Sequence, residues 1–157
     1  MKYNILVDNG KPYEIAVKNE KELKKHPETK KEIRRGRGEL ILVVDDEESI
    51  REITKAMLEN SGYKVATACD GAEGLAAYTK QQGQIKLVIM DMMMPILDGR
   101  QSIRALRKID PDVKIIAVSG LASTGKTEAA LEEDVFASLR KPYSSDVLLQ
   151  KIAEALV

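Results

Sequence analysis

Hydrophobic and polar positions follow two alternating patterns over the last three quarters of the chain. Short runs of consecutive apolar residues are separated by longer segments in which apolar residues recur every three or four positions. The first pattern is typical of strands buried on both faces, and the second of amphipathic helices. The predicted strands are the run ELILVVDDEE starting at Glu39, then Lys64–Ala68, Ile85–Asp91, Lys114–Ser119 and Val135–Arg140.

Helices are predicted in each interval that follows a strand. They cover Ser49–Asn60, Asp70–Gln81 and Asp98–Ile109, then a short helix from Thr124 or Thr127 to Glu133, and a last one from Ser144 or Ser145 to Leu156. Strands that alternate with helices in this way predict a doubly wound, five-stranded parallel α/β sheet. Such sheets bind ligands beyond the carboxyl ends of their strands.

The first 37 residues follow neither pattern. Two β-prone runs, YNILV and PYEIAV, flank an Asn-Gly pair and predict a β-hairpin. The Lys- and Glu-rich segment up to Arg35 predicts either an exposed helix or a linker, with Pro27 as a break or a start. Gly36-Arg37-Gly38 is expected to be a joint. We therefore expect an N-terminal extension at 1–37 and the main domain at 38–157.

Charge separates the same two segments. Residues 1–37 hold eleven Lys/Arg and six Asp/Glu, whereas the whole chain holds 25 of each. The basic excess lacks interleaved aromatic residues, so nucleic-acid binding is not expected. No apolar run approaches the roughly 18 residues of a membrane span. A lone cysteine, Cys69, excludes an internal disulfide and is expected in or near the core. We expect a cytoplasmic protein without membrane contact.

Chemically active side chains follow four of the predicted strands. Asp45 and Asp46 end the first strand, Asp91 the third, Ser119 the fourth, and Lys141 follows the fifth. Clustered carboxylates repel one another, and a hard cation such as Mg²⁺, with its preference for oxygen ligands, relieves this. A carboxylate can attack phosphorus, and an ammonium group can neutralise phosphoryl oxygens. Taken singly, each residue is most simply a helix cap, a turn residue or a surface group.

Four sequence blocks resemble those of response-regulator receiver domains of two-component signalling. They are LILVVDDEE, LVIMDMMMPILDG, IIAVSG and LRKPY, in the family's order and spacing. The resemblance covers about residues 39–157, includes receivers of hybrid histidine kinases, and implies a flavodoxin-like fold. It further implies Asp91 as phospho-acceptor, with Mg²⁺ held by Asp45, Asp46, Asp91 and the Met93 carbonyl. It implies Ser119 and Lys141 as phosphoryl-binding and switch residues and a cis peptide bond before Pro142.

One position departs from the family pattern. Receiver domains usually carry Tyr or Phe three residues before the lysine, and this chain has Ser138 there. Phosphorylation is still expected to move the loop after Ser119, but the usual inward rotation of an aromatic ring is not encoded at position 138.

A competing hypothesis rests on residues 120–127, GLASTGKT, which match the P-loop pattern of nucleotide-binding proteins. We rank it lower, because only thirty residues follow Thr127 and because a P-loop leaves Asp45, Asp46 and Lys141 without a role.

The favoured hypothesis is a phosphorelay component rather than an enzyme, with at most slow self-dephosphorylation. A histidine kinase or a histidine phosphotransfer domain would donate the phosphoryl group to Asp91 in the presence of Mg²⁺. No output domain is expected after the last helix. Three origins remain open: a stand-alone regulator, the terminal receiver of a hybrid histidine kinase, or a chain whose leader is the tail of a preceding domain. A homodimer, the signal and the downstream target remain open as well.

Overall fold

The computed structural model describes residues 3–8, 11–16, 32–120 and 133–157. The chain divides into two compact units, Met1–Glu32 and Ile33–Val157. In the first unit, β1 (Tyr3–Asp8) and β2 (Lys11–Ala16) pair antiparallel, from Tyr3↔Ala16 to Asp8↔Lys11. The predicted hairpin is therefore present. The charged segment after it, including Pro27, lies outside the described residues up to residue 31.

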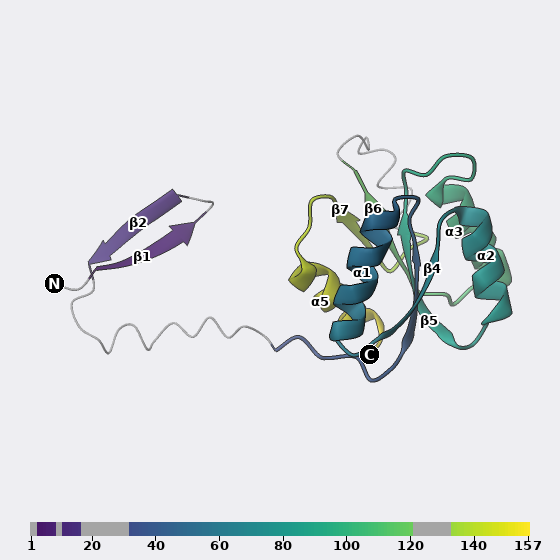
Figure 1. Cartoon of the computed structure of the whole chain (residues 1–157), viewed down its shortest axis with the longest axis horizontal. Helices are drawn as coiled ribbons and strands as arrows, with labels where there is room; N and C mark the ends of the chain where they lie inside the picture. Colours follow the sequence, from purple (N-terminus) through teal and green to yellow (C-terminus); the bar gives the residue numbers. More distant parts are fainter. Residues whose placement is uncertain (1–2, 9–10, 17–31, 121–132) are drawn as a thin grey trace. The chain divides into compact units, whose positions relative to one another are not determined.

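The second unit contains a five-stranded parallel sheet in the order β4-β3-β5-β6-β7 (Figure 1). β3, the first strand of this unit along the chain, lies inside the sheet, which is the doubly wound arrangement predicted from the alternating pattern. The strands are β3 (Leu40–Val44), β4 (Lys64–Ala68), β5 (Ile85–Asp91), β6 (Ile115–Ser119) and β7 (Ala137–Arg140).

Helices cover both faces of this sheet. α1 and α5 lie on one face, and α2 and α3 on the other (Figure 1). Their bounds are α1 (Glu48–Asn60), α2 (Gly71–Lys80), α3 (Gly99–Ile109) and α5 (Ser145–Ala155). Asp70, Asp98 and Ser144 stand where these helices were predicted to begin, and each side chain accepts a hydrogen bond from a first-turn backbone N–H group and so caps its helix. The short helix predicted to end at Glu133 lies outside the described residues, apart from Glu133 itself.

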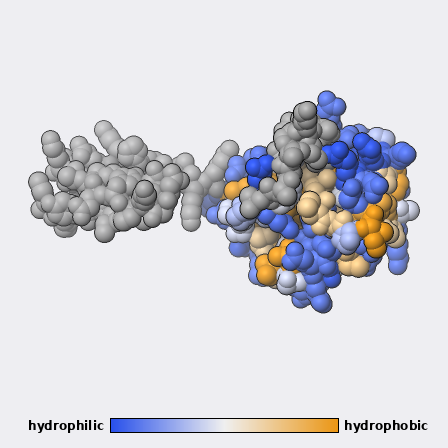
Figure 2. Space-filling model, turned by 90° about the horizontal axis from the view of Figure 1, so that it is seen from above, coloured by the Kyte–Doolittle hydropathy of each residue, from blue (hydrophilic) through white to orange (hydrophobic). Residues whose placement is uncertain are grey.

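Strand periodicity divides the core into two layers. Leu42, Val88 and Ile115 pack with Tyr78 and Ile103 of α2 and α3. Their strand neighbours Ile41, Leu87 and Ile116 pack on the other face, where Leu58, Leu148 and Ile152 come from α1 and α5. Because successive strand side chains point to opposite faces, a continuous apolar run is required to fill both layers. Figure 2 shows hydrophobic patches interspersed with hydrophilic residues on one face of the surface.

The chain enters the second unit through a tight contact at the amino edge of the sheet. Gly36 N–H donates to Ser61 O (2.9 Å), and Gly38 N–H to Gly62 O (2.8 Å). A Cβ atom on Gly36 would lie 2.5 Å from Cδ1 of the buried Tyr63 ring. The residues expected to be a joint thus pack on the second compact unit, Ile33–Val157.

The prediction for Cys69 is wrong: its side chain is exposed. Cys69 comes directly after Ala68, the last residue of β4, so it lies beyond the buried positions of that strand. The apolar character of a cysteine does not indicate where a strand ends. Within the described ranges, no helix is both long enough and apolar enough to span a membrane.

Candidate functional site

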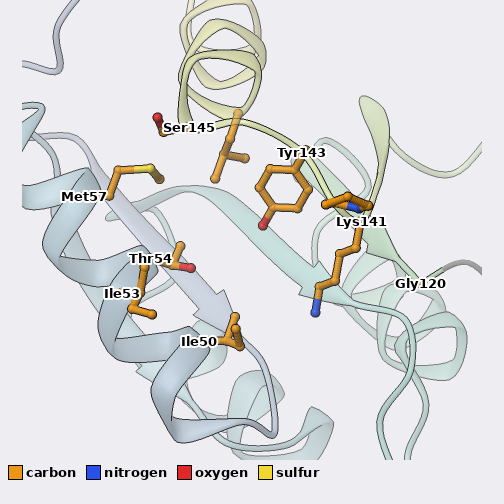
Figure 3. Close-up of a pocket in the computed structure, with 10 residues that line it drawn as sticks. Ile50, Ile53, Thr54, Met57, Gly120, Lys141, Tyr143 and Ser145 are labelled. Atoms are coloured by element: carbon orange, nitrogen blue, oxygen red, sulfur yellow. The ribbon is translucent and has the colours of Figure 1, made fainter. Parts of the chain in front are cut away.

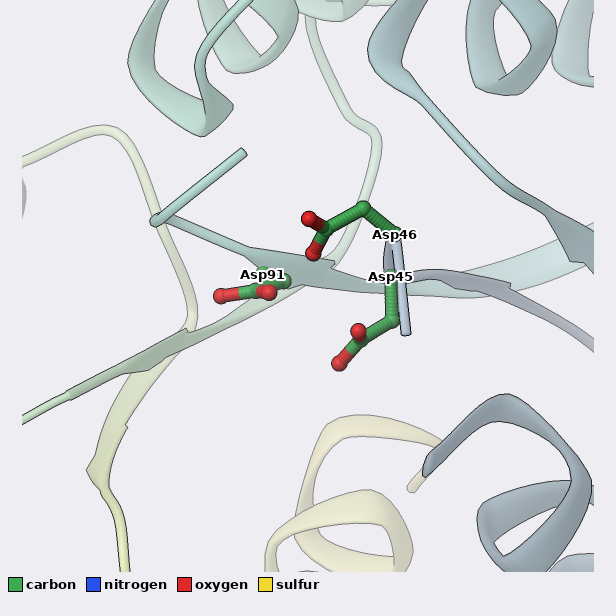
Figure 4. A group of neighbouring side chains, drawn as sticks. All are labelled: Asp45, Asp46 and Asp91. Carbon is green, nitrogen blue, oxygen red and sulfur yellow. The ribbon is translucent and has the colours of Figure 1, made fainter. Parts of the chain in front are cut away.

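Three carboxylates meet at the carboxyl edge of the sheet, at the ends of two neighbouring strands. Asp45 and Asp46 follow β3, and Asp91 ends β5 (Figure 4). One carboxylate oxygen from each lies within 4.8 Å of those of the other two. Asp45 and Asp91 are buried and Asp46 is exposed. Asp45 and Asp91 continue the strand alternation on the face that α1 and α5 cover, which explains why their side chains converge.

Lys141 brings a positive charge to this cluster from the end of β7. Its Nζ lies 3.5 Å from Asp45 Oδ2 and 4.0 Å from Asp91 Oδ2. Lys141 N–H donates to Ser119 O (2.8 Å), which ties the lysine to the end of β6. The Lys141–Pro142 peptide bond is cis, as the family resemblance implies. The ends of β3, β5, β6 and β7 therefore meet as the sequence predicted.

Backbone groups fix the two acidic turns. Met93 N–H donates to Asp91 Oδ1 (3.1 Å), and Glu47 N–H to Asp45 Oδ1 (2.9 Å). The Arg51 guanidinium, on α1, donates to the carbonyl oxygens of Asp45 (2.8 Å) and Asp46 (3.1 Å). Asp45 thus holds the turn before α1 but does not cap the helix, whose N-cap residue is Glu47, and its side chain also faces the acidic cluster.

Burial is the largest single influence on the pKa values of Asp91 and Lys141, and neighbouring groups add to it or oppose it. Burial raises the pKa of Asp91, and the neighbouring charges of Asp45 and Asp46 raise it further. The Met93 N–H and the Lys141 ammonium act in the opposite direction. Burial alone would lower the pKa of Lys141, but the carboxylates of Asp91 and Asp45 outweigh it and raise that pKa. The site therefore holds more negative charge than its single described ammonium group offsets.

Ser119 and Ser138 lie on adjacent strands, β6 and β7. Ser119 is half-buried at the end of β6, beside the strand that carries Asp91. Ser138 is exposed and pairs in register with Ala117. Phe136, the nearest aromatic residue before it along the chain, is also exposed.

A groove next to Lys141 was not anticipated from the sequence. It has a volume of about 570 Å³ and lies between α1 and the segment that joins β7 to α5 (Figure 3). Its lining is mainly apolar, with Lys141 and the Tyr143 ring at one side. Burial raises the pKa of Tyr143. The residues that line it are Ile50, Ile53, Thr54, Met57, Gly120, Lys141, Pro142, Tyr143, Ser145 and Leu148.

Two further residues were missed, Tyr143 and Arg51. The sequence offers a weak signal for Tyr143, which is an aromatic residue two positions after Lys141. Arg51 carries no signal, because its partners are backbone carbonyl oxygens five and six residues away.

Comparison with known proteins decides the family. The family model described as "Response regulator receiver domain" matches residues 41–153. This chain belongs to that family. Receiver domains are signalling domains of two-component systems, and the observed flavodoxin-like sheet is the receiver fold.

Relatives with similar sequences are named as regulators and as a kinase. The chain is 34% identical over 116 residues to the transcriptional regulatory protein GlrR of Escherichia coli, covering 74% of this chain and 26% of that protein. It is also 34% identical to the sensor kinase CckA of Brucella abortus, covering 74% and 12%. A receiver domain structure from Clostridium thermocellum is 37% identical with a TM-score of 0.71, covering 74% and 93%. The chain thus corresponds to about a quarter of GlrR.

The nucleotide-binding alternative is not supported by these comparisons. Its pattern at residues 120–127 also lies, except for Gly120, outside the described residues. By contrast, receiver domains bind Mg²⁺ at an acidic pocket, and the three-carboxylate cluster has the oxygen donors that Mg²⁺ prefers. The excess negative charge around Asp91 also fits a site that takes a divalent cation.

Proposed function

We propose that this receiver domain accepts a phosphoryl group on Asp91 from a phosphohistidine. The observation that carries the proposal is the position of Asp91. Like Asp45, it is a buried carboxylate that faces Lys141 and the other two acids, and of the three it alone ends β5, the central strand of the sheet. An acid that merely ended a strand would not be expected to lie beside an ammonium group and two further carboxylates.

The chemical step is a displacement at phosphorus. A carboxylate oxygen of Asp91 forms the new P–O bond while the P–N bond to the donor imidazole breaks, and the imidazole leaves with that electron pair. Lys141 lies close enough to Asp91 to neutralise charge on the transferred oxygens. It also favours the ionised form of Asp91, which is the nucleophile, against the effect of burial.

The remaining acids are assigned to the metal. Asp45, Asp46, Asp91 and the Met93 carbonyl would hold Mg²⁺, which offsets negative charge during phosphoryl transfer. Burial of Asp45 and the Arg51 hydrogen bonds to the acidic turn keep these side chains in place before any cation binds.

The phosphorylated state is proposed to be sensed through Ser119 and Lys141. The Ser119 hydroxyl gains a hydrogen-bond acceptor only after Asp91 is modified, so it can shift the equilibrium of the loop that follows β6. Ser138 offers no ring for the coupled movement usual in the family. We therefore assign the conformational signal to the loop after Ser119, without an aromatic partner at position 138.

The proposed partners are a histidine kinase or a histidine phosphotransfer domain, in the cytoplasm, with no nucleic acid or membrane bound by this chain. The apolar groove beside Lys141 supports a protein donor, because it gives such a partner a surface contiguous with the site. The domain itself would catalyse at most its own slow dephosphorylation. We propose that residues 38–157 form this functional domain.

Intact-mass measurement after treatment with acetyl phosphate tests the assignment. The wild type is expected to gain one phosphoryl group in the presence of Mg²⁺ and far less in EDTA. Asp91→Asn is expected to gain none, whereas the control Asp112→Asn, at an exposed aspartate after α3, behaves as the wild type. Continued labelling of Asp91→Asn would overturn the proposal.

A further inference from the structure

The loop that follows Asp91 is short and held at both ends. At its start, Met93 N–H donates to Asp91 Oδ1. At its end, Asp98 accepts from Gln101 N–H and begins α3. Gly99 packs so closely on the strand end that a Cβ atom there would lie 2.6 Å from Asp91 O. The loop must therefore reverse direction within a few residues while remaining beside the phospho-acceptor.

The reversal is concentrated at Ile96. This residue has φ of 72°, and Leu97 N–H donates to Pro95 O (3.0 Å) around it. A bond between residues two apart around a positive φ is the rare and strained form of the γ-turn. Among the described residues, Ile96 is the only one other than glycine with positive φ. A β-branched side chain is the least suited to this conformation, whereas Gly or Asn adopts it with less strain.

The fold does not bury the Ile96 side chain, so no packing offsets the strain of its backbone. It is fully exposed, with a relative accessibility of 102%. Met93, three residues earlier in the same loop, is 60% exposed. The loop geometry explains the positive φ, but it explains neither the choice of isoleucine nor the exposure of two large apolar side chains beside a charged site. Strain of this kind is retained where the residue serves a function.

The position of the loop beside Asp91 indicates which partner would bury the side chains of Ile96 and Met93. Asp91 is only 4% exposed, so a donor histidine must be brought deep against the carboxyl edge of the sheet. The loop begins directly after Asp91, and Gly99 at its other end packs on the Asp91 carbonyl, so a protein that delivers a phosphohistidine to this carboxylate comes close to it. An exposed apolar residue continuous with the site is the kind of contact that such a protein would bury.

We propose that Ile96 is a contact residue for the protein phosphodonor and determines which donors transfer efficiently. The proposal rests on the proposed function of Asp91. It distinguishes protein donors from small ones, because acetyl phosphate reaches Asp91 without touching Ile96.

The test compares two donors on the same variants. The protein donors are a panel of purified sensor-kinase transmitter domains, phosphorylated on histidine beforehand, from which the fastest on the wild type is chosen. Ile96→Asn is expected to slow transfer from this donor about five- to tenfold. Its labelling by acetyl phosphate should match the wild type, and its urea midpoint should be at or above the wild-type value. Val157→Asn, at an exposed apolar residue near the chain end, is the control and should change neither rate.

Each other outcome counts against the proposal. Equal slowing with both donors would place Ile96 in the chemistry of the site, and unchanged transfer from the protein donor would remove its role. If no transmitter labels the wild type while acetyl phosphate does, protein docking at this loop is wrong although the function of Asp91 stands. Loss of self-association in Ile96→Asn, measured by sedimentation, would make the covering partner a second copy. Failure of acetyl phosphate to label the wild type would overturn the proposed function itself.

Discussion

The two edges of the parallel sheet differ in how their side chains are used. At the amino edge, Gly36 lies under the Tyr63 ring, and backbone hydrogen bonds join the entering chain to the turn after α1. At the carboxyl edge, like charges converge at Asp45, Asp46 and Asp91, and Ile96 is strained and exposed. The amino edge is packed for stability, whereas the carboxyl edge gives up stability for chemistry and recognition. Substitutions at the two edges should therefore shift the free energy of unfolding in opposite directions.

The largest effect is expected at the amino edge from Gly36→Ala. The added Cβ would lie 2.5 Å from the buried Tyr63 ring, and overpacking of this kind costs about 2 kcal/mol. Urea unfolding measures the change. Gly120→Ala is the matched control, because Gly120, like Gly36, lacks a positive φ and a Cβ atom there would meet nothing within 4 Å. In a Tyr63→Ala background the cost of Gly36→Ala should largely vanish, and an undiminished cost would contradict the role of the ring.

A gain in stability is expected at the carboxyl edge from Asp91→Asn. The raised pKa of Asp91 shows that its charge is disfavoured in the folded protein, so a neutral side chain of the same shape relieves burial and repulsion. We expect the free energy of unfolding in EDTA at neutral pH to rise by about 1 kcal/mol. A loss of similar size would mean that the attraction between Asp91 and Lys141 outweighs both.

A pH-dependent effect is expected near the amino ends of the strands, at the pair Tyr78 and Asp110. The Tyr78 hydroxyl donates to Asp110 Oδ2 (2.6 Å), and burial together with this bond raises the pKa of Tyr78 strongly. Tyr78→Phe should cost about 1 kcal/mol at neutral pH. Because the folded pKa lies above the unfolded one, this contribution is complete below about pH 10 and is lost as the pH rises further. Unfolding curves of both proteins from pH 7 upward would show their difference shrinking, and a constant difference would contradict the assignment.

The smallest effect is expected from Ser138→Tyr. Position 138 is exposed, so the free energy of unfolding should change by less than about 0.5 kcal/mol. The new ring would test whether the strand beside Ser119 senses the modified site. NMR signals of the ring should shift when beryllofluoride and Mg²⁺ are added. Unchanged signals would show that position 138 takes no part in the conformational switch.

Much of this fold was predictable because strands buried on both faces leave a strong signal. The apolar runs ending at Asp91 and Ser119 identified β5 and β6 to within one residue, and the predicted starts of α2 and α3 at Asp70 and Asp98 lie one residue before the observed ones. The exposure of Ile53 was not predictable, because its apolar spacing in α1 is that of a core residue although it lines the groove. The same holds for Cys69, whose small apolar character suggested burial.

The sequence by itself determined the alternation of strands and helices, the acids at the strand ends and the family blocks that link them. These features are local or repeat at fixed spacing, so they can be recognised without coordinates. Only the tertiary structure decided that Lys141 faces Asp45 and Asp91, that Gly36 lies under Tyr63, and that Ile96 carries an exposed side chain on a strained turn. Each of these depends on contacts between distant segments or on a dihedral angle imposed by both ends of a loop, and neither leaves a periodic trace in the sequence.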